Sequence, residues 1–347
     1  MTKITPKTLY FLSFLEGATV MACEISGAKL AAPFFGSSLY VWGIALGVTL
    51  VGLSSGYFAG GWLSKKVNIV RPLLWILVIA SILLVFMPEL SKSLISDNFI
   101  TRPQTSENVS ESNIGNNFIY HAVLTITGYM FLPLFLFGMA PTMIGQYHNK
   151  VLERSGKIVG NVFTISTIGG IISTFLLGFF LLPEYGIPNT LLAYGTIMGG
   201  AAILFLILNN DFLSFIPLFI LSMGYFNSAE IENGKNYKML HHSDGVLGEL
   251  KVVEQPYTNS FETKLARVLL VNNTGQTIMN ANKLKQPLWQ DAHYFSAPAE
   301  IFPEGSKVLL LGLGGGTFYN QFKHIGHKVD IVEFDKRIAE VAKKYFN

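Results

Sequence analysis

Cysteine and charged residues are both scarce in this sequence. Its 347 residues include one cysteine, Cys23, which lies inside an apolar run. A single thiol excludes an intrachain disulfide and a Cys-x-x-Cys metal site. Charged residues make up 14% of the chain and the mean hydropathy is +0.42, whereas soluble globular proteins carry about 25% charged residues. The composition therefore predicts that most of the chain is a membrane protein.

Basic residues are too few and too scattered for a nucleic-acid partner. The formal net charge is +3, and the sequence contains no cluster of Lys and Arg interleaved with aromatic residues, so we expect no nucleic-acid binding. A cleavable signal peptide is not expected either, because the first apolar run carries Glu16 and Glu24 and continues into further apolar sequence. We interpret this run as a retained first membrane span.

Long apolar runs dominate residues 1–230. A helix that crosses the bilayer core needs about 20 mostly apolar residues. The six runs that we predict as spans are Leu9–Ala31, Tyr40–Leu63, Pro72–Pro88, Phe118–Gln146, Ile158–Pro183 and Pro188–Leu208. A seventh candidate, Phe212–Ala229, contains Pro217. We prefer a re-entrant or interfacial element there, and a seventh span stays open.

Positive charge in the connections sets the expected orientation. Residues 64–71 contain three Lys or Arg, and residues 147–157 contain three against one acid, whereas the polar loop 89–117 is net acidic. Lys and Arg favour the cytoplasmic side. We therefore predict an inner or plasma membrane protein with a cytoplasmic N-terminus, in which six spans return the chain to the cytoplasm near Asn209.

Charged residues return from about Glu230, where short alternating segments replace the long runs. Strands are expected at Leu247–Glu254, at Leu265–Asn272 and near Thr277–Asn280, with a turn at Asn272–Gln276. These strands predict a small β-hairpin domain over residues 231–300.

Residues 301–347 alternate between strand and helix patterns. The expected order is a strand at Lys307–Leu311, a glycine turn, a helix at Thr317–Ile325, a strand at Val329–Glu333 and a helix at Lys336–Phe346. This is the βαβα opening of a doubly wound, Rossmann-like α/β domain. A parallel sheet needs helices on both faces, and a start of only two strands does not provide this cover.

The glycine turn has the features of a cofactor loop. Gly312, Gly314 and Gly316 alternate after the strand, where glycine permits a tight turn and close approach of a ligand to the backbone. The following helix N-terminus offers free amides and a positive dipole end. Glu333 stands 21 residues after Gly312, at the end of the next strand, where an acid accepts hydrogen bonds from ribose hydroxyls. A glycine turn without a ligand is the alternative; Asp335 is expected to cap the last helix.

Several motifs carry a resemblance to a known family. The segments are "SDGVLGELKVVE" (243–254), "LLVNNTGQT" (269–277), "VLLLGLGGGTFYN" (308–320) and "VDIVEFDKRIAEVAKKYF" (329–346), with "EISGAKLAAPFFGSSLYVWG", "GYFAGGWLSKK" and "GNVFTISTIGGIISTFLLGFFLLPEYG" in the membrane half. Together they resemble the spermidine synthases (polyamine aminopropyltransferases), in the branch that has a major-facilitator-like membrane domain before the synthase domain.

The resemblance implies a chemistry and a set of site residues. Decarboxylated S-adenosylmethionine would donate an aminopropyl group to a polyamine amine. Gly312, Gly314 and Gly316 would line this donor and Glu333 would hold its ribose. Gln276 matches a glutamine that ends a turn in the family, and Tyr294 matches a tyrosine on the substrate side.

The sequence departs from the family at three positions and at its end. Gly315 stands where an aspartate helps to bind the amino end of the donor, Phe295 where a histidine is usual, and Gly248 where a glutamine is expected. The chain ends 12 residues after Asp335, before any match to the family's catalytic aspartate. We therefore expect a C-terminally truncated catalytic domain without aminopropyltransferase turnover.

Two carboxylates inside the first span are a separate candidate site. Glu16 and Glu24 lie eight residues apart, so they fall within about 80° of each other around a helix. Intramembrane carboxylates are costly and usually face the interior of a bundle. They predict either a site for a small cation, such as a polyamine or a proton, or a structural pair. In the second case Lys29 or a polar neighbour neutralises Glu24, and Glu16 lies near a membrane interface.

Three functions therefore stay open. The first is a membrane-bound spermidine synthase-like protein that uses decarboxylated S-adenosylmethionine or S-adenosylmethionine as co-substrate, in a lipid bilayer and compatible with a homo-oligomer. The second is a major-facilitator-like transporter or sensor of a small cation with a nucleoside-binding soluble part. The third is a protein like the S-adenosylmethionine-dependent methyltransferases.

His241, His242 and His293 have no acid or cysteine at metal-ligand spacing, so we expect no metal.

Overall fold

The chain divides into two compact units, Met1–Ala229 and Glu230–Asn347, close to the domain boundary expected at residue 230. The computed structural model describes residues 5–36, 38–65, 69–94, 111–152, 155–209, 237–243, 247–258, 262–272, 274–289 and 301–346, with residues 211, 213, 216–217, 219–221, 245 and 294. Most of the possible seventh span, 212–229, lies outside these residues.

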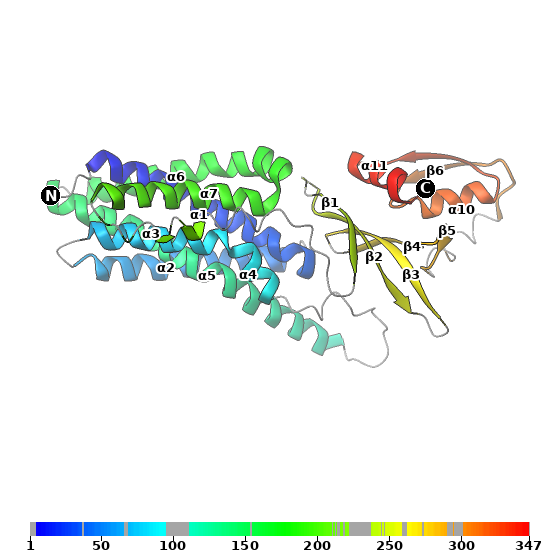
Figure 1. Cartoon of the computed structure of the whole chain (residues 1–347), viewed down its shortest axis with the longest axis horizontal. Helices are drawn as coiled ribbons and strands as arrows, with labels where there is room; N and C mark the ends of the chain where they lie inside the picture. The colour runs from blue at the N-terminus through cyan, green and yellow to red at the C-terminus, as the bar shows by residue number, and fades with distance from the viewer. Residues whose placement is uncertain are drawn as a thin grey trace. The chain divides into compact units, whose positions relative to one another are not determined.

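The described part of the first unit consists of helices (Figure 1). Short polar residues begin the first two: the Thr5 hydroxyl accepts a hydrogen bond from the Thr8 amide, and Ser38 does the same for Val41. A π-helical turn at Leu177–Leu181 separates the last two helices. The helices are α1 (Pro6–Phe35), α2 (Leu39–Leu63), α3 (Val70–Val85), α4 (Met87–Leu94), α5 (Glu111–Leu152), α6 (Ser155–Leu176) and α7 (Leu182–Leu208).

Four helical runs are long and apolar enough to cross a membrane, or five if the bent pair α3 and α4 counts as one span. That pair is bent by 54°. The run Gly156–Leu208 is counted once, although its backbone leaves helical geometry at Gly186, where φ is +73°. The hydroxyl of Ser173 donates to that of Tyr194 at 2.9 Å, so side chains from the two arms meet. These helices are consistent with a membrane protein.

The expected polar loop 89–117 is partly helical. Residues 89–94 belong to α4 and residues 111–117 to α5, while 95–110 lie outside the described residues. Helical backbone therefore extends beyond the apolar windows, because intrahelical hydrogen bonds do not need apolar side chains.

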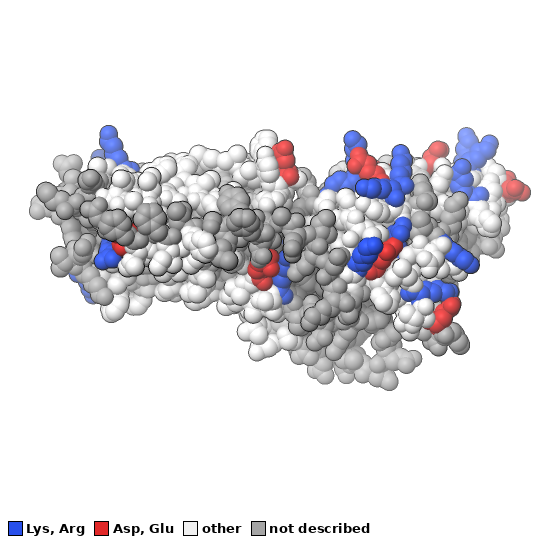
Figure 2. Space-filling model, viewed as in Figure 1, with Lys and Arg blue, Asp and Glu red and all other residues white. Residues whose placement is uncertain are grey.

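The helices pack in pairs, α2 along α5, α1 along α6 and α3 along α7. Glycines mark the closest approaches. A Cβ atom on Gly138 would lie 2.9 Å from the carbonyl oxygen of Leu53, and one on Gly56 would overlap the carbonyl of Phe135. Charged side chains are sparse on the visible face of this unit and frequent on that of the second unit (Figure 2), as expected for a lipid-facing helical surface.

The second unit begins with a five-stranded antiparallel meander in the order β1-β2-β3-β4-β5 (Figure 1). The three expected strands are confirmed as β2 (Leu250–Thr258), β3 (Thr263–Val271) and β4 (Thr274–Asn280). The two edge strands, β1 (Lys238–Ser243) and β5 (Lys283–Pro287), were not expected. The sequence "KLKQP" of β5 ends in proline, which sheets tolerate at an edge but which does not predict a strand.

The expected βαβα order is confirmed in β6 (Lys307–Leu311), α10 (Thr317–His324), β7 (Lys328–Val332) and α11 (Lys336–Tyr345). The strands β6 and β7 pair in parallel, in register from Lys307 opposite Lys328 to Leu311 opposite Val332. A Rossmann-like sheet has further strands, so this element order alone establishes only a parallel βαβα unit.

Helix α11 covers the meander. Val341 and Phe346 are buried with Leu250, Val252 and Leu269 in one apolar cluster, so the βαβα segment and the meander share a core. One face of the sheet formed by β6 and β7 is exposed. On it, the side chains of Leu309, Leu311 and Val332 are 62%, 80% and 56% exposed. The expectation that two strands leave one sheet face uncovered is confirmed.

Candidate functional site

The glycine loop turns sharply between β6 and α10. Gly312, Gly314 and Gly316 have φ of +98°, +55° and +83°, a region that residues with a Cβ rarely adopt. The amide of Gly312 donates to the carbonyl of Val332 at 2.8 Å, which fixes the start of the loop beside the end of β7. Each alternate glycine is therefore required by the backbone path of the loop.

The carboxylate of Glu333 joins the loop to the end of β7. Its Oε2 accepts a hydrogen bond from the Leu313 amide at 2.7 Å, and its Oε1 accepts one from the Asp335 amide at 2.9 Å. The side chain is half-buried. Two carboxylate oxygens offer about four acceptor positions, so Glu333 retains capacity for a ribose hydroxyl.

The glycines differ in what surrounds them. A Cβ on Gly312 would meet nothing within 4 Å, so a ligand can approach the backbone closely there. A Cβ on Gly315 would lie 2.7 Å from the Thr277 methyl and 3.0 Å from the Phe346 ring. The Gly315 amide donates to the Thr277 hydroxyl at 2.8 Å. The family's aspartate therefore has no room at residue 315, because β4 and the end of α11 fill that side of the loop.

Gln276 lies beside the loop, and Tyr294 is not linked to it by the described contacts. Gln276 is the extra residue of a β-bulge, because Leu269 pairs with Thr277 whereas Leu270 pairs with Gly275. Bulges often redirect a side chain next to a functional site, and the Gln276 side chain is exposed. Tyr294 is 75% exposed, and Phe295 lies outside the described residues.

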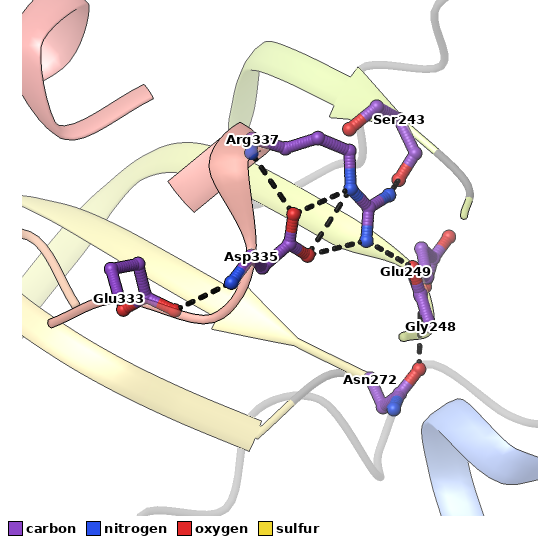
Figure 3. Close-up of polar contacts among 7 residues, drawn as sticks. All are labelled: Ser243, Gly248, Glu249, Asn272, Glu333, Asp335 and Arg337. Carbon is purple, nitrogen blue, oxygen red and sulfur yellow. Dashed lines mark hydrogen bonds and ion pairs between the residues drawn. The ribbon is translucent and has the colours of Figure 1, made fainter. Parts of the chain in front are cut away.

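Arg337 organises the segment before β2, a role that the sequence did not reveal (Figure 3). Its guanidinium donates to Asp335 at 2.7 Å, to the Gly248 carbonyl at 3.1 Å and to the Ser243 carbonyl at 3.4 Å. A Cβ on Gly245 would lie 2.5 Å from the guanidinium carbon. Ser243, Gly245 and Gly248 of the "SDGVLGELKVVE" segment are therefore in contact with one side chain of α11.

Gly248 is fixed by its own conformation and by Asn272. Its φ is +110°, and a Cβ there would overlap the Asn272 carboxamide, which accepts a hydrogen bond from the Glu249 amide at 3.0 Å. Asn272 itself has φ of +49°, which asparagine tolerates better than most residues. A glutamine is thus excluded at residue 248 for the same reason as an aspartate at residue 315.

Two carboxyl groups of the second unit have pKa values below their usual range. Asp335 accepts from the Arg337 amide as the N-cap of α11, as expected from the sequence. Burial opposes its ionisation, but hydrogen bonds from Arg337 outweigh it and hold the pKa of Asp335 below its usual range. Burial also opposes ionisation of Glu249, yet His242 at 3.0 Å and Lys251 at 2.7 Å lower the pKa of Glu249. The contact between His242 and Glu249 was not expected from the sequence, where His242 was considered only for metal-ligand spacing.

The intramembrane carboxylates have different environments. Glu16 is 2% exposed, and its Oε2 accepts a hydrogen bond from the Ser166 hydroxyl of α6 at 2.9 Å. Glu24 is half-buried. No described hydrogen bond joins the two carboxyl groups, so the structure does not bring them into one pair.

Comparison with known proteins gives no relative to which this arrangement can be matched. No family model matches the chain, and no curated protein or solved structure matches it. Within the described ranges, no three His, Cys, Asp or Glu side chains group closely enough to hold a metal ion. The case for a function therefore depends on the geometry of the two sites.

Proposed function

We propose that this is a membrane-anchored protein whose second unit binds an S-adenosyl nucleoside at the Gly312–Gly316 loop, in the manner of the spermidine synthases. The observation that carries this proposal is the Glu333 carboxylate, which lies at the end of β7 and accepts the Leu313 amide of the loop. An acid in this position is suited to ribose hydroxyls.

The loop and its surroundings support nucleoside binding over a bare turn. Space is open at Gly312, and Glu333 keeps free acceptor positions beside it. Gly316 is the N-cap of α10, so the first amides of this helix provide partial positive charge next to this space. When bound, decarboxylated S-adenosylmethionine would supply a sulfonium-activated aminopropyl group and S-adenosylmethionine a methyl group.

We propose aminopropyl transfer to a polyamine as the reaction, since the resemblance implies it. With Gly315 packed under Thr277 and Phe346, the amino end of the donor would need recognition by other groups. Gln276 and Tyr294, both exposed, are the residues of this chain that we assign to the substrate side. Methyl transfer from S-adenosylmethionine is the alternative for the same pocket.

The membrane arrangement that we propose has six spans. Helices α1, α2 and α5 cross once each, and the bent pair α3 and α4 forms one span. The chain reverses at the break at Gly186 inside α7, so that α6 and the part of α7 after Gly186 cross separately. With the N-terminus in the cytoplasm of an inner or plasma membrane, the second unit would also be cytoplasmic. S-adenosyl co-substrates are found on that side. An assembly of several copies is compatible with this arrangement.

Binding of methylthioadenosine, S-adenosylmethionine and decarboxylated S-adenosylmethionine to the purified full chain tests the proposal. Glu333→Gln should weaken all three about tenfold, since a hydrogen bond to a charged group contributes about 1.5 kcal/mol or more. Glu340→Gln is the matched control, because Glu340 is an exposed carboxylate of α11 whose described contact is with Lys336. Equal affinities for both variants, or no binding by the parent chain, would refute the nucleoside site.

A second candidate function is transport or sensing of a small cation by the first unit, Met1–Ala229, which we call the membrane unit. The observation that favours it is the burial of Glu16 among helices. Uptake of labelled putrescine or spermidine into proteoliposomes tests it, with Glu16→Gln expected to abolish uptake. The absence of uptake by the parent chain would exclude polyamine transport.

A further inference from the structure

Glu16 is a titratable group that nucleoside binding does not use. It lies on α1, ten residues after the first helical residue Pro6 and so about 15 Å along a helix that is long and apolar enough to cross a membrane. Its side chain is 2% exposed. A carboxyl group buried in this way is shielded from water, so the groups that surround it determine its charge state.

The surroundings of Glu16 are tight and uncharged. The Ser166 hydroxyl of α6 donates to Oε2 at 2.9 Å. One residue further along α1, a Cβ on Gly17 would overlap the Ser166 carbonyl, and the Ser13 hydroxyl donates to the Val162 carbonyl at 3.1 Å. Helices α1 and α6 therefore touch on both sides of the carboxyl.

Among the residues that the structure describes, the titratable groups of the neighbouring helices supply no counter-charge to Glu16. Tyr57 of α2 is within electrostatic reach of Glu16, and its ring contacts Phe163 of α6. Tyr129 of α5 donates to the Gly27 carbonyl, and Tyr194 of α7 accepts from Ser173. The charged side chains described on helices packed against α1 lie near helix ends: Glu89 and Lys92 of α4, Lys157 of α6 and Glu184 of α7. On α1 itself, Lys7, Glu24 and Lys29 stand eight or more residues from Glu16.

An ionised carboxylate without a cation is very unfavourable in such a setting, and the usual response is protonation. We propose that Glu16 is a proton-binding site of the membrane unit. When α1 and α6 are packed together, the carboxyl is neutral. Its Oε1 carries the proton, and its Oε2 accepts the hydrogen bond from the Ser166 hydroxyl. Release of this proton to water requires α1 and α6 to separate at Gly17. This proposal goes beyond nucleoside binding and does not depend on it.

Infrared difference spectroscopy of the full chain in lipid measures the protonation state directly. A protonated carboxylic acid has a carbonyl stretching band that an ionised carboxylate lacks. At pH 7 we expect this band in the parent chain and its loss in Glu16→Gln, an isosteric change that preserves an acceptor for Ser166. Glu184→Gln is the control: Glu184 is an exposed carboxyl of the same unit, and its replacement should leave the band unchanged.

A second variant keeps the proposal testable if Glu16→Gln fails to assemble. Ser166→Ala retains the carboxyl but removes the hydrogen bond to Oε2, so the carbonyl band should move to higher frequency. Two results would overturn the proposal. One is a parent-minus-Glu16→Gln spectrum at pH 7 with only ionised carboxylate bands, and the other is an unchanged protonated-acid band in Ser166→Ala.

Discussion

The amide of Gly315 donates a hydrogen bond to the hydroxyl of Thr277 across 2.8 Å, which joins the glycine loop to β4. Both groups are buried, and the Phe346 ring closes the same side of the loop. The loop is thus held on one side by protein contacts and open on the other at Gly312.

Gly315→Asp, which introduces the acid usual in the resembled family, should destabilise the second unit. A Cβ there would lie 2.7 Å from the Thr277 methyl, and crowding of a packed site costs about 1–3 kcal/mol, to which a buried charge adds. Thermal denaturation with hydrogen exchange of the loop peptides measures the effect. A stable Gly315→Asp chain with unchanged exchange would contradict the packing account.

Thr277→Val should destabilise the same region by about 1–3 kcal/mol, because the buried Gly315 amide loses its acceptor. The control is Thr274→Val, since Thr274 is exposed at the start of β4 and surface substitutions usually stay within about 0.5 kcal/mol. Faster exchange of residues 312–317 in the first variant alone is the expected result. Equal exchange in both variants would remove Thr277 from this role.

Arg337→Lys should loosen residues 243–248 although it preserves the charge. One guanidinium bridges Asp335 and the carbonyls of Ser243 and Gly248, and an ammonium group lacks the planar fork that makes several such bonds at once. Hydrogen exchange of the peptide before β2 should rise severalfold. Lys336→Gln serves as the control, because Lys336 is 91% exposed. If Lys336→Gln raised the exchange of this peptide as much as Arg337→Lys does, the result would argue against a specific bridge by Arg337.

The pH dependence of the membrane unit should include a contribution from Asp211. Hydrogen bonds from Arg71 at 2.7 Å and from the Trp75 indole at 3.1 Å lower the pKa of Asp211. Because the pKa of Asp211 is lowered in the folded state, its ionisation stabilises the fold at pH values above the unfolded pKa of about 3.9. This stabilisation is lost as the pH falls through the folded pKa. Asp211→Asn should therefore melt at a lower temperature at pH 7, and the difference from the parent should shrink below pH 4. A constant difference across that range would contradict the ionic contribution.

Local patterns of the sequence predicted the βαβα segment well. The alternation in β6 and β7, the three positive-φ glycines and the cap Asp335 all lie within about 30 residues, and each depends on backbone rules that act locally. The position of Glu333 followed from the same short-range pattern. Its contact with the Leu313 amide gave the pattern a geometry that the sequence alone had not supplied.

Contacts between distant segments were not predictable in this way. Gly315 and Thr277 are 38 residues apart, Arg337 and Ser243 are 94 apart, and Glu16 and Ser166 are 150 apart. No periodicity encodes such pairs. In the membrane unit the difficulty is greater, because helices that are apolar on all sides do not indicate which face is packed.

Two adjacent glycines of α2 offer a test of helix packing in the membrane unit. A Cβ on Gly60 would lie 2.5 Å from the Met139 carbonyl of α5 and would overlap the Thr142 hydroxyl, whereas a Cβ on Gly61 would meet nothing within 4 Å. Gly60→Ala should therefore push α2 from α5 at a cost of about 1–3 kcal/mol. Gly61→Ala should be neutral or stabilising by about 0.5–1 kcal/mol, because alanine favours the helix. Melting temperatures of the two variants in one detergent give the comparison, and a Gly60→Ala chain as stable as Gly61→Ala would show that α2 and α5 do not approach as closely as these contacts require.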